Sequence, residues 1–167
     1  MEKSKGTETD KEELFEAAEK GNRSKVKALL KMGVDANSRD IIGQSALSRA
    51  LFARHKGIAG ILLDKGANVN AKDDCGETAL HKACYLGRDD VVKLLLENKA
   101  DVNVKDEHGN TALIIASETE DSSIAKILLK NKADIHLKNN RGNTAFSIAR
   151  KFEYTTIVSL FDQYLLV

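Results

Sequence analysis

Both cysteines of the chain lie close together in the sequence, with a histidine between them. The segment DDCGETALHKAC contains Cys75, His81 and Cys84. Thiolate and imidazole groups bind zinc, and a thiolate is also the nucleophile of reactive cysteines. This segment therefore raises three alternatives, which are a metal site, a reactive thiol and a purely structural role.

Sequence motifs for phosphate binding, nucleophilic catalysis and metal binding are absent. The chain contains no GxxxxGK[ST], GxGxxG, GxSxG or HExxH pattern and no EF-hand loop. Carboxylates are plentiful, but Asp73, Asp101, Asp106 and Asp134 recur at regular intervals. Regular recurrence favours hydrogen bonds in turns and loops over an acid–base pair. The sequence predicts a protein that is not an enzyme and that has no cofactor and no metal site.

Composition limits the classes of partner. Of the 167 residues, 42% are apolar, 31% are charged and 5% are aromatic, and none is proline. This composition is typical of a folded, mostly helical protein that is long enough to form its own core. The 26 Lys and Arg residues balance the 25 Asp and Glu residues, so the broad positive field that binds nucleic acid is missing. We expect neither nucleic acid nor membrane as a partner.

The N-terminal segment MEKSKGTETDKEELFEAAEKG alternates charges where a signal peptide would have an apolar core. No stretch approaches the ~20 apolar residues of a membrane span. The sequence therefore predicts an intracellular monomer with reduced thiols, located in the cytoplasm or alternatively in the nucleus.

Four glycines, at Gly43, Gly76, Gly109 and Gly142, recur with a spacing of 33 residues. The segments around them are DIIGQSAL, DDCGETAL, DEHGNTAL and NNRGNTAF. A second block recurs as VDANSR, ANVNAK, ADVNVK and ADIHLK, and a third as VKALL, AGILL, VKLLL and AKILL. A strict period of this length indicates a solenoid of stacked supersecondary units.

These blocks resemble the ankyrin repeat, a β-turn followed by two antiparallel helices. The resemblance extends from Asp10 to the C-terminus, and the segment GETALHKACYLGRDDVVKLLLENKADVNVK matches the family pattern best. It implies an all-α fold, an ankyrin-repeat solenoid of helix–turn–helix units with β-turn or hairpin tips. The predicted organisation is a disordered tail (1–9) and a single ankyrin-repeat domain (10–167), with an N-terminal cap (10–39), repeats (40–72, 73–105 and 106–138) and a C-terminal cap (139–167).

Hydroxyl residues stand just before the first helical pattern of four units. Ser45, Thr78, Thr111 and Thr144 can each accept a hydrogen bond from an unpaired backbone N–H, as N-cap residues do. The family has proline at the next position, whereas this chain has alanine in all four units. Because proline is only favourable at the first helical position, we expect the helices to begin there.

Glycine is expected at the left-handed residue of each tip and at several helix ends. Some units lack the glycine at the helix ends. A non-glycine residue in a left-handed conformation costs about 1 kcal/mol, so these positions are expected to be strained if they adopt it. The residues concerned are Arg54, Glu120 and Glu153 after the first helix and Lys99 and Lys132 after the second.

The repeat separates the three residues of the segment DDCGETALHKAC. Cys75 falls at a turn tip, as a contact residue or an exposed thiol, and Cys84 falls inside a helix as a small packing residue. His81 stands at the histidine position of the family, which implies that it braces the turn of a neighbouring unit. The four histidines occupy four different phases, so the repeat does not gather them into a zinc site.

Ankyrin stacks are protein-binding scaffolds, so the resemblance implies a non-catalytic interaction module, either an adaptor or an inhibitor. Its partner would be another protein, bound on the concave face of turn tips and first helices. The alternatives are an ankyrin fragment of a larger multidomain protein, a host-directed effector scaffold, an enzyme built on the stack and a modification substrate. Asn70 and Asn103 resemble ankyrin asparagines that an oxygenase hydroxylates, although a loop hydrogen bond is the favoured explanation.

Two consecutive isoleucines, Ile41 and Ile42, stand at one turn tip. The local structure does not explain them, because turns favour Gly, Asn, Asp and Ser. Together with Phe52 and Tyr85 they are expected to form an apolar patch that anchors a partner, beside an acidic rim in the fourth unit. In the alternative, one isoleucine folds inward and Phe52 is partly core. Carried over by position from the family, the predicted partner-binding residues are Ile41, Ile42, Gln44, Phe52, Asp74, Cys75, Glu77, Tyr85, Leu86, Glu107, His108, Asn110 and Glu118.

The two ends of the predicted stack differ in polarity. The segment DKEELFEAAEK places Leu14, Ala17 and Ala18 on one face with charges elsewhere, as an outward-facing terminal helix does. The C-terminal segment FDQYLLV is apolar. We expect Leu165 and Leu166 to fold back onto the last repeat, with a truncated end or a partner contact as the alternatives.

Overall fold

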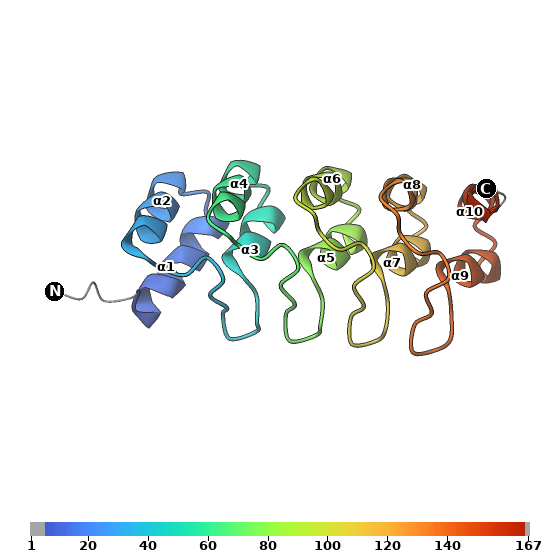
Figure 1. Ribbon diagram of the computed structural model, residues 1–167, viewed down its shortest axis with the longest axis horizontal. Coiled ribbons are helices and arrows are strands. Elements are labelled where there is room, and N and C mark those ends of the chain that lie inside the picture. Colours follow the sequence, from blue (N-terminus) through green and yellow to red (C-terminus); the bar gives the residue numbers. More distant parts are fainter. Residues whose placement is uncertain (1–5, 166–167) are drawn as a thin grey trace. The chain divides into compact units, whose positions relative to one another are not determined.

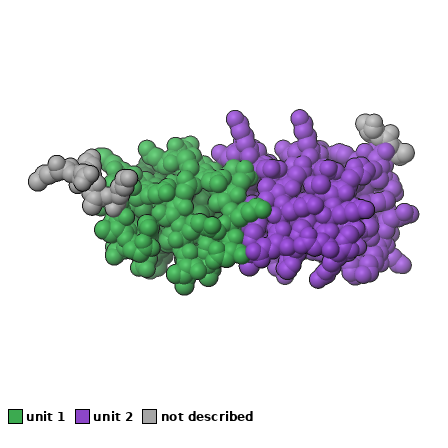
Figure 2. All heavy atoms as spheres, turned by 60° about the horizontal axis from the view of Figure 1, so that its bottom comes forward, with its two compact units in different colours: residues 1–74 green, residues 75–167 purple. Residues whose placement is uncertain are grey.

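The structure is a computed structural model that describes residues 6–165. In this part of the chain all regular secondary structure is helical, apart from an isolated β-bridge between Arg39 and Ser45. The chain divides into two compact units, 1–74 and 75–167 (Figure 2). The first unit contains α1 (Glu8–Glu19), α2 (Arg23–Met32), α3 (Ala46–Phe52) and α4 (Lys56–Asp64). The second contains α5 (Ala79–Tyr85), α6 (Asp89–Glu97), α7 (Ala112–Glu118), α8 (Ser122–Lys130), α9 (Ala145–Lys151) and α10 (Thr155–Leu165).

Each unit is a stack of helix pairs (Figure 1). In the first unit α1 packs on α2 and α3 on α4, and the two pairs meet through α1 with α3 and α2 with α4. In the second unit α5, α7 and α9 form one row, and α6, α8 and α10 form the other. This arrangement confirms the predicted all-α fold of stacked helix–turn–helix units. The division after Asp74 falls close to a predicted repeat boundary, and the organisation into a single domain stays a prediction.

The predicted N-caps are confirmed. The side chains of Ser45, Thr111 and Thr144 accept hydrogen bonds from the backbone N–H of the residue three positions later. Thr78 occupies the same position before α5, where its hydroxyl and backbone N–H contact the ring of His81. The hydroxyl at each of these positions therefore marks the start of the first helix of a pair.

The first helix begins earlier than the sequence predicts. Thr7 and Asp10 form a reciprocal cap, in which Thr7 N donates to Asp10 Oδ2 (2.7 Å) and Asp10 N donates to Thr7 Oγ1 (3.2 Å). Residues 7–9, predicted as part of a disordered tail, thus form the cap and the first turn of α1. Of the rest of the predicted tail, Gly6 is described, and residues 1–5 lie outside the described residues.

Small residues allow the first helices to pack closely. Alanines that recur at one phase of the repeat are fully or almost fully buried, and large aliphatic side chains such as Leu47 and Leu113 fill the space around them. The second helices contribute Leu62 in the first unit and Leu128 in the second. The recurring alanines are Ala17, Ala50, Ala83, Ala116 and Ala149.

Left-handed residues occur where the sequence predicts them. The glycine of each tip has a φ between +70° and +79°, and it closes a turn in which, for example, Gly43 N donates to Asp40 O (3.0 Å). The helix ends without glycine adopt the same region with φ between +56° and +68°, so the expected strain is present there. These residues are Arg54, Lys99, Glu120, Lys132 and Glu153.

The C-terminal helix corrects one prediction. Phe161 is fully buried and packs edge-on against Phe146, with ring centroids 6.0 Å apart. Beyond it the chain continues as helix to Leu165, which is 44% exposed, so the expectation that Leu165 folds back is wrong. The physical reason is that α10 continues to satisfy its own backbone groups through this residue. Leu166 lies outside the described residues.

Candidate functional site

The two cysteines occupy different environments. Cys84 is fully buried in α5, and burial raises the pKa of its thiol well above the usual range. Its thiol is therefore protonated and unreactive, as expected for a packing residue. Cys75 lies on an exposed tip, and neither cysteine forms a disulfide. Among residues 6–165 no group of three or more potential ligands could hold a metal ion.

His81 is a structural residue of the second unit. Its Nδ1 accepts a hydrogen bond from Thr78 N (3.1 Å), while its Nε2 donates to Val104 O (3.0 Å) and Asn110 O (3.2 Å). Burial lowers the pKa of the imidazole, although the charges of Asp106 and Glu77 act in the opposite direction. The neutral ring thus braces the following loop and tip, as the resemblance implies.

Asp40 organises the exposed tip of the first unit. Its Oδ1 accepts from the backbone N–H groups of Ile42 (3.0 Å) and Gln44 (2.8 Å), and its Oδ2 accepts from the guanidinium of Arg49. The tip projects both isoleucines into solvent, with Ile41 99% exposed and Ile42 52% exposed. The alternative in which one isoleucine folds inward is therefore wrong. Phe52, at the end of α3, is half-buried.

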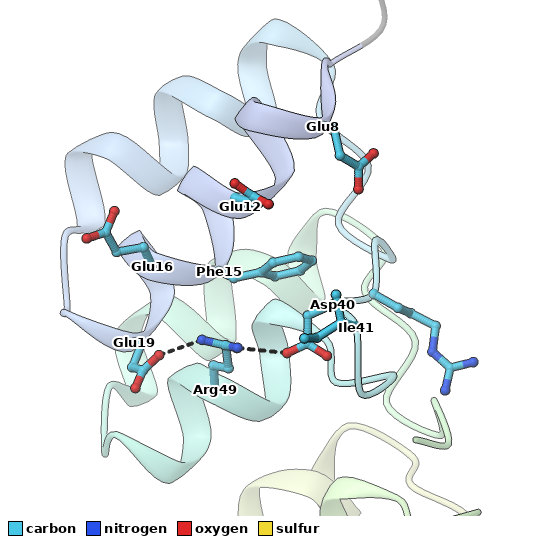
Figure 3. A pocket seen from close by; sticks show the side chains of 9 residues that line it. Glu8, Glu12, Phe15, Glu16, Glu19, Asp40, Ile41 and Arg49 are labelled. Atoms are coloured by element: carbon cyan, nitrogen blue, oxygen red, sulfur yellow. Dashed lines mark hydrogen bonds and ion pairs between the residues drawn. The ribbon is translucent and has the colours of Figure 1, made fainter. Parts of the chain in front are cut away.

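A groove of about 500 Å³ lies between α1, the tip and α3 of the first unit (Figure 3). Phe15 is almost fully buried beneath it, and the guanidinium carbon of Arg49 lies 5.8 Å from the centre of its ring. Arg49 is held between Glu19 Oε2 (2.6 Å) and Asp40 Oδ2 (2.8 Å), as Figure 3 shows. The lining residues are Glu8, Glu12, Phe15, Glu16, Glu19, Arg39, Asp40, Ile41 and Arg49.

A second hollow of about 390 Å³ shares Glu19 and Arg49 with the groove and is also lined by Gln44, Phe52 and Ala53. The first unit thus gathers three predicted site residues, Ile41, Gln44 and Phe52, around one Arg49-centred surface. Sequence reasoning missed the contribution of α1 to this surface. A detectable signal was the spacing of its glutamates, which places Glu8, Glu12, Glu16 and Glu19 along one side of a helix.

Asp74 lies at the end of the first unit, where its Oδ1 is 3.7 Å from Arg39 Nη2. The remaining predicted site residues belong to the second unit, so the expected apolar patch of Ile41, Ile42, Phe52 and Tyr85 is divided between the two units.

In the second unit the end of α5 presents Tyr85 (71% exposed) and Leu86 (55% exposed). The predicted tip residues Glu107 and His108 are exposed, whereas Glu77 and Asn110 are half-buried. Asp106 holds the tip around Gly109 as Asp40 holds the tip around Gly43, because its Oδ1 accepts from His108 N (2.9 Å) and Asn110 N (2.7 Å).

Glu118 ends α7 near this tip. Partial burial raises the pKa of its carboxyl and Asp106 acts in the same direction, whereas Arg141 and His108 lower it. The side chain of Asn103 forms hydrogen bonds within the loops, which is the favoured explanation for this asparagine. Its Oδ1 accepts from Asp134 N (2.8 Å) and its Nδ2 donates to Lys132 O (3.3 Å).

The stacked helix pairs, the turn tips and the exposed surfaces beside them define a helical repeat protein of the solenoid class. The family model for ankyrin repeats in three copies matches residues 14–106, and the model for ankyrin repeats in many copies matches 105–149. The chain belongs to the ankyrin-repeat family. A comparison with curated proteins finds none that matches.

Ankyrin repeats are generally protein–protein interaction modules, and proteins built from them are typically non-catalytic scaffolds that bind protein partners. Within the part of the chain that the structure describes, no helix combines the length and the apolar character needed to cross a membrane.

Proposed function

We propose that this chain is a non-catalytic adaptor or inhibitor that acts in the cytoplasm and binds a protein partner through its tips and first helices. The observation that carries the proposal is the pair of exposed isoleucines, Ile41 and Ile42, on a tip that Asp40 holds in place. Large apolar side chains held on an exposed, ordered loop are suited to anchor a partner, because little conformational entropy is lost when they bind.

The neighbouring surface supports this role. Ile41 lines the groove, and the hollow next to Phe52 shares Glu19 and Arg49 with it. A partner side chain could therefore be enclosed on several sides, which is the environment in which interface residues contribute most to affinity. In the second unit, Tyr85 and Leu86 with the acidic residues Glu107 and Glu118 are proposed as further contacts.

The proposal is tested with a double variant that carries both Ile41→Ser and Ile42→Ser. This variant and the wild type are each used as bait in affinity capture from the native lysate. Full burial of one isoleucine contributes about 1.5–3 kcal/mol, so the partner should be bound at least ~10-fold less tightly. The matched control is Met32→Ser, which removes another exposed apolar side chain, on α2.

Proteins retained by the wild type and by the Met32 variant, but lost by the isoleucine variant, would support the proposed surface. Circular dichroism of the three baits shows whether the fold is unchanged. An unaltered set of captured proteins for the isoleucine variant would contradict the proposal.

A further inference from the structure

We propose that the groove of the first unit binds a basic segment of the partner, which carries a Lys or Arg side chain beside an apolar one. This inference rests on the proposed function, because it assigns a chemical class to the partner of the same surface. Three features carry it, and all lie within the first unit: the shape of the groove, the charge of its walls and the opposite charge of the neighbouring helix.

The groove has the size of a binding cleft, although its lining is mostly charged. At about 500 Å³ it lies within the range of ~300–1,000 Å³ that is typical of ligand clefts, so it can enclose side chains of a partner. Ile41 supplies an exposed apolar wall, and Phe15 lies beneath. An apolar side chain of the partner would remove Ile41 from water, and the methylene stem of a Lys or Arg could cover the same surface.

The charge of the groove is negative. The α1 wall carries Glu8, Glu12, Glu16 and Glu19, whose spacing keeps them on one side of the helix (Figure 3). A concave surface with charges of one sign focuses its field and attracts a ligand of the opposite sign. A cationic side chain of the partner is therefore favoured here, and an acidic segment is disfavoured.

The positive charges near the groove are already engaged. Arg49 is bound by Glu19 and Asp40, and Arg39 lies 3.7 Å from Asp74 and donates from Nε to Gly43 O (2.9 Å). These contacts leave the two arginines poorly placed to neutralise the middle of α1.

Two lysines of the first unit pair with glutamates on either side of the middle of α1. Lys11 Nζ lies 2.8 Å from Glu8 Oε2, and Lys20 Nζ lies 2.5 Å from Glu16 Oε1. Between these pairs Glu12 is exposed, and it makes no ion pair within residues 6–165. Glu12 is thus the carboxylate most available to a cation from the partner.

The neighbouring helix has the opposite charge. The sequence of α2, RSKVKALLKM, contains Arg23, Lys25, Lys27 and Lys31 and no acidic residue. A basic segment is repelled by α2 and attracted by the α1 wall, so the charge pattern of this unit directs it to the groove. A bound metal ion would require converging ligands, and no such group exists among the described residues.

The probe is a library of random peptides displayed on phage and selected against the full chain. We expect the enriched peptides to combine Lys or Arg with a neighbouring apolar residue. One enriched peptide is then synthesised with a fluorescent label, and its affinity is measured by anisotropy at two salt concentrations. Because the contact is partly electrostatic and exposed, the affinity should fall as the salt concentration rises.

The deciding comparison uses two variants that change the net charge of the first unit equally. Glu12→Lys reverses the charge in the groove, and Asp64→Lys reverses an exposed charge on α4 outside it. We expect Glu12→Lys to weaken peptide binding by about 10-fold or more and Asp64→Lys by less than about 2-fold, since charge-assisted contacts act locally. Glu12→Gln, which removes the charge without reversing it, should give a smaller loss than Glu12→Lys.

Equal losses of peptide affinity in Glu12→Lys and Asp64→Lys would overturn the inference. A selection that yields only acidic or neutral peptides would overturn it too, as would enriched peptides whose binding does not depend on Glu12. The isoleucine variant separates the two proposals. If it abolishes binding of the captured partner while Glu12→Lys has no effect, the proposed surface stands and its basic ligand is wrong. If neither change affects any partner or peptide, both proposals fail.

Discussion

Arg49 donates two hydrogen bonds to the same oxygen of Asp40, because Oδ2 lies 3.2 Å from Nε and 2.8 Å from Nη2. The other oxygen, Oδ1, accepts from two backbone N–H groups of the tip. One carboxylate therefore shapes the tip that carries Ile41 and also fixes the arginine at the centre of the groove. Burial alone would raise the pKa of Asp40, but hydrogen bonds from Arg49 and the tip outweigh it and lower the pKa.

Replacement of this carboxylate by an amide should separate its two roles. Asn139 already serves as a tip residue, where its Oδ1 accepts from Arg141 N and Asn143 N, both at 3.0 Å. Asp40→Asn should thus keep the tip but weaken the charge-assisted contact with Arg49, at a cost of about 1–2 kcal/mol in the free energy of unfolding. Urea denaturation followed by circular dichroism measures this loss.

Asp106→Asn is the matched control, because Asp106 holds an equivalent tip but makes no ion pair within the described residues. It should cost less than about 0.5 kcal/mol in the free energy of unfolding.

The stabilisation by Asp40 should depend on pH. Since the pKa of Asp40 is lowered in the folded state, its contribution to the free energy of unfolding is complete above the unfolded pKa near 3.8 and is lost as the pH falls through the folded pKa. The difference between wild type and Asp40→Asn should therefore shrink in acid, and equal losses for both variants at neutral pH would contradict the proposed role of Arg49.

The imidazole of His81 should make the stability of the second unit depend on pH. Protonation would place an N–H at Nδ1, opposite the N–H of Thr78 that now donates to it. Because burial lowers the folded pKa, the unfolded chain takes up its proton first, and stability should fall as the pH drops from 6.5 toward the folded value. Denaturation curves recorded above and below pH 6.5 measure this change.

His81→Leu should cost about 1–3 kcal/mol at pH 7.5, because the carbonyls of Val104 and Asn110 lose a donor. The same variant should abolish most of the pH dependence in this range. The exposed His136 offers a control, and His136→Asn should leave the stability at pH 7.5 close to that of the wild type. A wild-type stability that does not change between pH 7.5 and 5.5 would show that His81 does not act as the titrating group.

The sequence predicts most of the fold because the same residue types recur at the positions that make the same contacts in every unit. Caps such as Thr111, tip glycines such as Gly43 and the bracing role of His81 all follow from phase alone. The exposure of Ile41 was also predictable, because a turn tip offers an isoleucine little to pack against. These features are local or are repeated with the same geometry, so each position can be assigned without knowing the rest of the surface.

The groove could not be predicted in the same way. Glu12 and Phe15 belong to the terminal helix, which lacks the tip motif of the full repeats, and charges on such a helix are expected simply to face solvent. Their importance depends on Arg49 and Ile41, which come from other elements of the first unit. The direction of Leu165 was mispredicted for a related reason, since an apolar residue in a short segment does not show whether the helix continues or turns back.

The left-handed helix ends provide a test of backbone strain. Glu120 is exposed and has a φ of +56°, a conformation that costs a residue with a side chain about 1–2 kcal/mol. Glu120→Gly should remove this strain. Glycine also increases the conformational entropy of the unfolded chain, which offsets part of the gain, so the net stabilisation of the protein should be about 0.5–1 kcal/mol. Lys126→Gly, in the middle of α8, is the opposite control and should destabilise it by about 1 kcal/mol. The two variants should therefore shift the urea midpoint in opposite directions, and a shift of Glu120→Gly in the same direction as Lys126→Gly would show that the strain at this helix end is small.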